Sequence, residues 1–174
     1  MADDRLKLSA LDADDLAVIA ACVQDALAPI GEIAFLPTER RFVLAINRFR
    51  WDRLDAAKLA ARNVDRPPPR QRTDAAFLDP GGKGPAYERV HSGLRFENVT
   101  GARSTGIDLR DRERILELLT IHSESGAVSL IFAGGATIRL EITELRCYLE
   151  DFGDAWPTRW RPFHPDDTPG SRRK

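Results

Sequence analysis

The sequence predicts an α+β domain that is rich in antiparallel strands and has one main helix near the N-terminus. A hairpin is centred on Gly134-Gly135, a pair that can adopt the positive φ values of a tight turn. Apolar residues alternate with polar ones on both sides of this pair, at Val128, Leu130, Phe132, Ile138, Leu140 and Ile142. Since successive side chains of a strand point to opposite faces, each strand has one apolar face and one solvated face.

A second hairpin joins residues 30–36 to residues 41–51 across residues 37–40. The apolar positions of its outgoing strand match those of the strand after the glycine pair; the matching residues are Phe42, Leu44, Ile46 and Phe49 against Ile138, Leu140, Ile142 and Leu145. We interpret the match as a weak internal repeat, which suits a pseudo-symmetric PH-like or sandwich-like fold. Chance is the rival explanation, because any two amphipathic strands share such a pattern.

The predicted helix follows a short alternating run at residues 5–10, which is compatible with an edge strand. Asp12 is a good N-cap, and Asp14 and Asp15 place negative charge on the first turn. Apolar residues then recur at helical spacing, at Leu16, Ile19, Ala20, Val23 and Leu27. Pro29 is expected to end the helix.

Three later segments are predicted to be strands. The first runs from Tyr87 to Val99, bends near Ser92-Gly93 and is extended by residues 103–107. Residues 114–123 fit a strand or a helix, and we favour a strand because turn signals bound the run and a hairpin follows it. Residues 144–152 continue the alternation after the glycine hairpin, with a short C-terminal helix as the alternative.

These elements predict a single domain over residues 1–156, interrupted by an insertion at about 55–85. The insertion is rich in proline and glycine and poor in apolar periodicity, a composition typical of flexible segments. Residues 157–174 form a proline-rich basic tail.

Composition limits the classes of function. The 26 basic and 27 acidic residues give a net charge of -1, so no global field favours nucleic acid or an anionic membrane. No apolar run is long enough for a signal peptide or a membrane span, and both Cys22 and Cys147 lie in apolar-patterned segments. We therefore expect a cytoplasmic protein with free cysteines and no membrane partner.

The strongest local constellation is a basic strand at residues 40–53. It interleaves Arg41, Arg48 and Arg50 with Trp51, in a stretch that also contains Arg40, Arg53 and Phe49. Arginines that meet phosphates and rings that stack on bases would suit single-stranded RNA. The competing interpretation is an edge strand kept soluble by charge, with its aromatic residues in the core.

The C-terminal aromatic residues are candidates for binding a partner. Trp156, Trp160 and His164 lie among prolines in a segment that cannot form a core alone. We expect Trp156 to dock on the domain, because it closely follows Asp151-Phe152-Gly153.

Other chemistry has little support. The three histidines, at 91, 122 and 164, have no metal-ligand spacing, so no metal, cofactor or catalytic residue is predicted. An enzyme would need a carboxylate or histidine site assembled by the fold, for example from acids near residues 141–154 with His122 or His164.

Several stretches together resemble a bacterial family known as domain of unknown function 2948. They are residues 24–26, Asn47-Arg48-Phe49-Arg50-Trp51, residues 116–121, residues 130–135 with 138–141, Asp151-Phe152-Gly153, and residues 156–164. The resemblance implies a single-domain cytoplasmic protein and supplies no activity, cofactor or catalytic residue.

The leading hypothesis is a non-enzymatic binding or adaptor domain with an unknown protein partner. The first alternative is a protein that binds single-stranded RNA through residues 40–53, and the second is an enzyme with a fold-assembled site. The sequence gives no oligomeric state.

Overall fold

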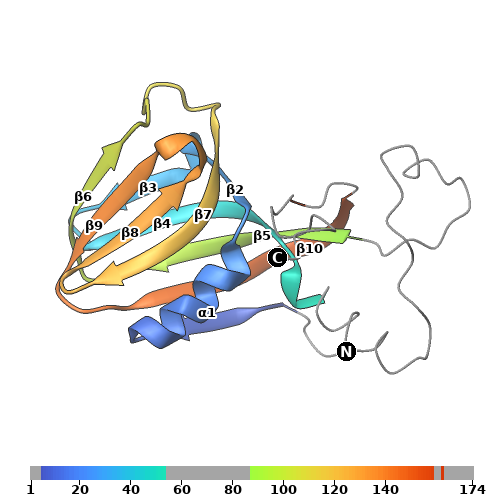
Figure 1. Cartoon of the computed structure of the whole chain (residues 1–174), viewed down its shortest axis with the longest axis horizontal. Coiled ribbons are helices and arrows are strands. Elements are labelled where there is room, and N and C mark those ends of the chain that lie inside the picture. The colour runs from blue at the N-terminus through green and yellow to red at the C-terminus, as the bar shows by residue number, and fades with distance from the viewer. Residues whose placement is uncertain (1–4, 54–86, 159–161, 163–174) are drawn as a thin grey trace, which may run out of the picture.

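The computed structural model describes residues 5–53, 87–158 and 162. Figure 1 shows an antiparallel sheet that curls on itself, with helix α1 at its lower end and a short helical segment that begins at residue 51. The predicted insertion, Trp160 and His164 lie outside the described residues. The elements are β1 (Lys7–Ala10), α1 (Ala13–Val23), β2 (Ala26–Pro29), the 3₁₀ turn η1 (Ile30–Glu32), β3 (Ile33–Leu36), β4 (Arg41–Phe49), β5 (Tyr87–Phe96), β6 (Val99–Thr105), β7 (Ile115–Glu124), β8 (Ala127–Phe132), the 3₁₀ turn η3 (Ala133–Gly135), β9 (Thr137–Ile142) and β10 (Cys147–Thr158).

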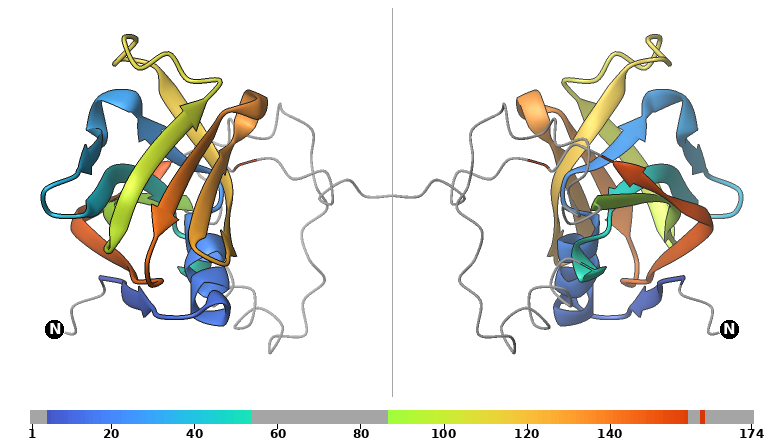
Figure 2. Two further views of the ribbon diagram at one scale, coloured as in Figure 1. Left: turned by 90° about the vertical axis from the view of Figure 1, so that its left-hand side faces the viewer. Right: turned by 90° about the vertical axis from the view of Figure 1, so that its right-hand side faces the viewer.

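All strand pairs are antiparallel, and the strand order is β1-β10-β5-β4-β2-β7-β8-β9-β6 with β3 paired to the first half of β4. The β6 end of the curled sheet approaches the start of β4, where the Val99 amide donates a hydrogen bond to the Arg40 carbonyl, at 2.8 Å. Both views in Figure 2 show how strongly the sheet is curved. The predicted strand-rich antiparallel domain with one main helix is confirmed.

Both predicted hairpins are present. In the first, β8 pairs with β9 across η3, and Gly134 and Gly135 have φ values of 76° and 79°. Residues other than glycine rarely adopt such positive φ values, which explains why two glycines occupy this turn. In the second, β3 pairs with β4 and places Leu36 opposite Arg41.

The N-terminal region differs from the prediction in one respect. Asp12 caps α1 as expected, since its side chain accepts a hydrogen bond from the Asp15 amide at 2.9 Å. The helix ends at Val23, however, so the expectation that it continues to Pro29 was wrong. Asp25 has a φ of 59°, and the chain then enters β2, whose Pro29 pairs with Ile115 of β7.

The later strands largely follow the sequence pattern. Residues 115–124 form a strand, and so do residues 147–158, which excludes both helical alternatives. Strand β10 continues to Thr158, past the predicted domain boundary at residue 156. The prediction that residues 103–107 extend the preceding strand was wrong, because the chain turns at Asn98, whose φ is 60°, and residues 99–105 pair with β9.

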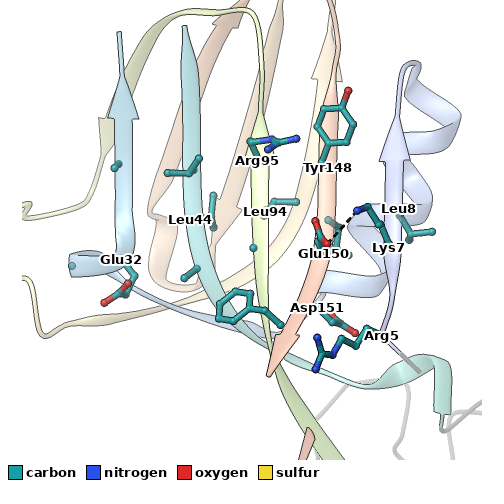
Figure 3. A pocket seen from close by; sticks show the side chains of 17 residues that line it. Arg5, Lys7, Leu8, Glu32, Leu44, Leu94, Arg95, Tyr148, Glu150 and Asp151 are labelled. Atoms are coloured by element: carbon teal, nitrogen blue, oxygen red, sulfur yellow. Dashed lines mark hydrogen bonds and ion pairs between the residues drawn. The ribbon is translucent and has the colours of Figure 1, made fainter. Parts of the chain in front are cut away.

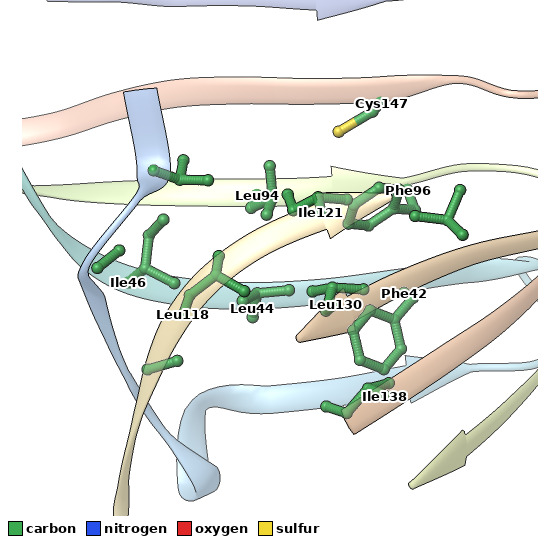
Figure 4. Packing of buried hydrophobic residues seen from close by; sticks show 14 of the residues in the cluster. Phe42, Leu44, Ile46, Leu94, Phe96, Leu118, Ile121, Leu130, Ile138 and Cys147 are labelled. Carbon is green, nitrogen blue, oxygen red and sulfur yellow. The ribbon is translucent and has the colours of Figure 1, made fainter. Parts of the chain in front are cut away.

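The core fills the inside of the curled sheet (Figure 4). Inward-facing residues of neighbouring strands stand opposite one another, as in Leu44 beside Leu94 and Leu94 beside Leu149. Helix α1 closes one end of this core with Leu16, Ile19 and Val23. The outward-facing residues of β3, β4, β5, β10 and β1 are therefore left on the surface, and they form the floor of the site described below.

Candidate functional site

A buried ionic cluster lies inside the sheet, near α1. Strand β4 carries Arg48 on the same face as its core residues, and the register brings Asp151 of β10 opposite Ser92 of β5. Arg48 is 0% exposed and Asp151 is 3% exposed. The Arg48 guanidinium donates to both carboxylate oxygens of Asp151, from Nε at 2.8 Å and from Nη2 at 2.6 Å, and a third hydrogen bond runs from its Nη1 to Asp52 at 2.7 Å. This bidentate geometry is the strong form of an arginine–carboxylate pair.

Asp151 is ionised in this cluster despite its burial. Burial alone raises the pKa of a carboxyl group, but hydrogen bonds from Arg48, from the Ser92 hydroxyl at 2.6 Å and from the Leu6 amide, together with the Arg48 charge, hold the pKa of Asp151 below its ordinary value. The pKa of Arg48 is raised, because the hydrogen bonds and charges of Asp151 and Asp52 outweigh its burial.

The cluster also fixes the edge strand β1. The Leu6 amide donates to Asp151 Oδ2 at 3.0 Å, and the Asp151 amide donates to the Leu6 carbonyl at 2.9 Å. Since β1 is four residues long, these two hydrogen bonds extend its attachment to β10. We conclude that the cluster has a structural role and that it positions β1 as one wall of the surface groove.

The other members of the basic strand also pair with carboxylates. Arg50 is 7% exposed and its Nη1 donates to Glu88 at 3.1 Å. Arg41, on the outer face, pairs with Glu39 at 2.7 Å and with Glu97 at 2.9 Å. Arg48 and Arg50 therefore do not stand on an open surface beside Arg41, and the structure does not bring the three guanidinium groups together.

The aromatic residues of the basic strand pack against the domain. Trp51 donates from its Nε1 to the Gln24 carbonyl at 3.0 Å, and its ring lies 4.5 Å from that of Phe49. Phe49 is buried and also contacts the Tyr87 ring at 5.7 Å. Phe49 is buried and Trp51 half-buried, so these rings do not form an open stacking platform. The competing interpretation was wrong about the edge strand, however, because β4 pairs with β5 on one side and with β2 and β3 on the other.

A cluster of three rings lies on the outer face of β5 and β10. His91 stacks on Phe152 with a centroid distance of 5.9 Å and contacts Trp156 at 4.4 Å. The strand register shifts between Phe152 and Trp156, next to Gly153 with its φ of 75°, and this bulge turns Trp156 toward His91. Phe152 is 47% exposed, and sequence reasoning missed both Phe152 and His91. The available signal for Phe152 was the alternation along β10: Leu149 and Asp151 face inward, so Phe152 faces outward.

Figure 3 shows the groove that adjoins this cluster, with a volume of about 820 Å³. Its floor consists of small outward-facing residues: Ala34, Val43, Ala45 and Gly93. The register sets Ala34 opposite Val43 and Ala45 opposite Gly93, so the small side chains form one continuous apolar strip across β3, β4 and β5. Larger side chains, among them Tyr148 and Phe152, border the strip on β10.

Charged side chains line the two sides of the groove differently. Arg5, Lys7 and Arg95 lie on the side of β5 and β1, where Lys7 pairs with Glu150 at 3.2 Å. Arg95 shares Glu97 with Arg41 and places its guanidinium carbon 4.7 Å from the centre of the Tyr148 ring. Glu32 lies on the opposite side, at the end of η1 and just before β3 (Figure 3).

The described residues hold no group of three or more His, Cys, Asp or Glu side chains that could bind a metal ion. His122 is on the outer face of β7, opposite Ser129. Both cysteines are free, and burial raises the pKa of the Cys22 and Cys147 thiols. In the part of the chain that the structure describes, no helix is both long enough and apolar enough to cross a membrane.

Taken together, the described residues form a mainly β domain whose curled antiparallel sheet carries a surface groove on its outer face. The chain belongs to the family described as protein of unknown function (DUF2948), whose model matches residues 6–164. This confirms the resemblance found in the sequence. Comparisons with curated proteins and with solved structures give no match.

Proposed function

We propose that the protein is a non-enzymatic binding or adaptor domain of the cytoplasm, and that its outer-face groove receives a segment of a protein partner. The observation that carries the proposal is the uninterrupted apolar strip on the groove floor, Ala34, Val43, Ala45 and Gly93. Apolar concave surfaces with a few polar groups at the rim are the usual form of a binding site. Exposed apolar surface on a folded domain commonly marks an interaction site.

The rim supports recognition of a peptide segment rather than of a highly charged polymer. Its cations are accompanied by carboxylates, as in the Lys7–Glu150 pair and in the Arg41–Glu97–Arg95 group. Tyr148 and the half-exposed Phe152 add rings of the kind that supply much of the binding energy at protein interfaces. The free cysteines suit a reducing compartment.

Site-specific photocrosslinking tests this proposal. A photoreactive phenylalanine analogue replaces Val43 on the groove floor, and the control places the same analogue at Ser129, which lies on the outer face of β8. We expect a protein crosslink from position 43 that is absent from position 129. Equal crosslinking from both positions would contradict the proposal.

The RNA alternative stays a prediction, and the same experiment distinguishes it. A crosslinked product that ribonuclease removes and protease does not would favour RNA. Within the described part of the basic strand, Arg48 and Arg50 are engaged by Asp151 and Glu88, so such a product would have to involve other cations of the surface.

A further inference from the structure

We infer that the groove takes an amphipathic α-helix of the partner, with acidic residues on the flank that faces Arg5, Lys7 and Arg95 and a basic residue on the flank that faces Glu32. This inference rests on the proposed function and specifies the secondary structure and charge of the bound segment. Three features of the groove carry it.

The first feature is the hydrogen bonding of the floor strands. Strand β4 pairs with β5 on one side and with β3 and β2 on the other, and β5 lies between β4 and β10. Their backbone groups are thus already used in the sheet. An extended peptide gains affinity mainly by adding to a free sheet edge, and on this face its own N–H and C=O groups would be buried without partners. Strands β3 and β1, at the two sides of the groove, each pair on one side only, but the floor between them is formed by β4 and β5. A helix satisfies its backbone internally, so a helix suits the face of these two paired strands.

The second feature is the shape of the floor. The distance from β3 to β10, across β4 and β5, is three inter-strand spacings of about 4.8 Å each, or about 14 Å. One helix with its side chains is about 10–12 Å across. Because the floor residues are small, the apolar side chains of such a helix can approach the sheet closely, while Tyr148 and Phe152 stand at the border of the strip.

The third feature is the separation of charge. Three cations, Arg5, Lys7 and Arg95, line one side of the groove. Glu150 pairs there with Lys7, Glu97 is shared by Arg95 and Arg41, and Asp151 is neutralised by Arg48, so cations outnumber the carboxylates that accompany them. The carboxylate of Glu32 lines the other side. A helix that carries acids along one flank and a base on the other matches both sides.

The test selects 16-residue peptides from a random display library on the full chain and measures the affinity of the enriched peptides by fluorescence anisotropy. We expect apolar residues at positions i, i+3, i+4 and i+7 with acids along one flank, and a gain of helical circular dichroism on binding. An enriched set with a period of two, or rich in proline, would overturn the inference.

Two floor-filling variants connect the peptides to the groove. Gly93→Val suits a strand, because Gly93 has no positive φ and its added Cβ would meet only the Phe152 ring, at 3.8 Å. Ala45→Leu fills the same strip if the first variant folds poorly. We expect either variant to weaken binding at least tenfold, and Ser129→Val, the matched outward-facing control, to leave it unchanged.

The charge part is tested by reversal. Arg95→Glu should weaken a peptide with acidic flank residues several-fold and should strengthen its lysine-substituted counterpart; equal effects on both peptides would refute the charge assignment. If non-helical peptides bind and Gly93→Val blocks them, the helix inference is wrong while the groove function stands. If neither floor-filling variant affects any selected peptide, both proposals fail.

Discussion

Removal of the Asp151 carboxylate should destabilise the fold far more than removal of any surface carboxylate. In Asp151→Ala, the Arg48 guanidinium, which is 0% exposed, loses both hydrogen bonds to its bidentate partner and keeps only the bond to Asp52. The Ser92 hydroxyl and the Leu6 amide lose an acceptor as well. An uncompensated buried charge of this kind typically costs about 3–5 kcal/mol, a large share of the roughly 5–15 kcal/mol that stabilises a domain.

Urea unfolding followed by circular dichroism measures this effect. The double variant Arg48→Met, Asp151→Leu removes both charges, and it should be less destabilised than Asp151→Ala because no charge is left buried. As the surface control, Glu150→Ala removes an exposed partner of Lys7 and should cost about 0–1 kcal/mol. Two results would refute the structural role of the cluster. One is a cost below about 1 kcal/mol for Asp151→Ala. The other is a double variant whose loss of stability equals the sum of the losses in Arg48→Met and in Asp151→Leu.

Three further predictions follow from the same geometry. The pKa of Asp151 is lower in the folded than in the unfolded protein. Its contribution to the free energy of unfolding is therefore fully present above the ordinary carboxyl pKa of 3.8 and is lost as the pH falls below that value. Acid titration of the free energy of unfolding should show this loss in the wild type and a shallower loss in Asp151→Asn. Gly153→Ala should cost about 1–2 kcal/mol, because φ is 75° and nothing lies within 4 Å of the added Cβ, and a stability change near zero would show that the backbone relaxes there. A thiol reagent should modify Cys22 before Cys147, since Cys147 is fully buried and more strongly shifted; simultaneous labelling in the folded state would contradict the core packing.

The sequence was sufficient where the local pattern decides the structure. Both hairpins follow from alternation and turn residues, and the start of α1 follows from Asp12. The end of α1 was less readable, because Leu27 continues the helical spacing of Val23 while it also fits a strand. Pairing of β2 with β7 decides in favour of the strand, and those segments are about 90 residues apart.

The site was predicted less well, for a similar reason. Alternation along β4 places Arg48 on the face of Phe42, Leu44 and Ile46, so its inward orientation could have been deduced. Its partner could not, because Asp151 lies 103 residues later in the chain. The groove depends on the register of five strands, which no local pattern defines. The pseudo-repeat of the two hairpins stays a prediction.

The pairing of β1 with β10 has a consequence for the order of events during protein synthesis. Leu6 and Asp151, which exchange hydrogen bonds, are 145 residues apart. During translation β1 therefore leaves the ribosome long before its partner strand exists. Helix α1 is likewise made before the later strands that complete the core. Pairings this distant in sequence close late and slow folding. The groove wall that contains Arg5 and Lys7 is consequently completed only after β10 has been made, so a nascent chain that stops before β10 lacks the complete groove.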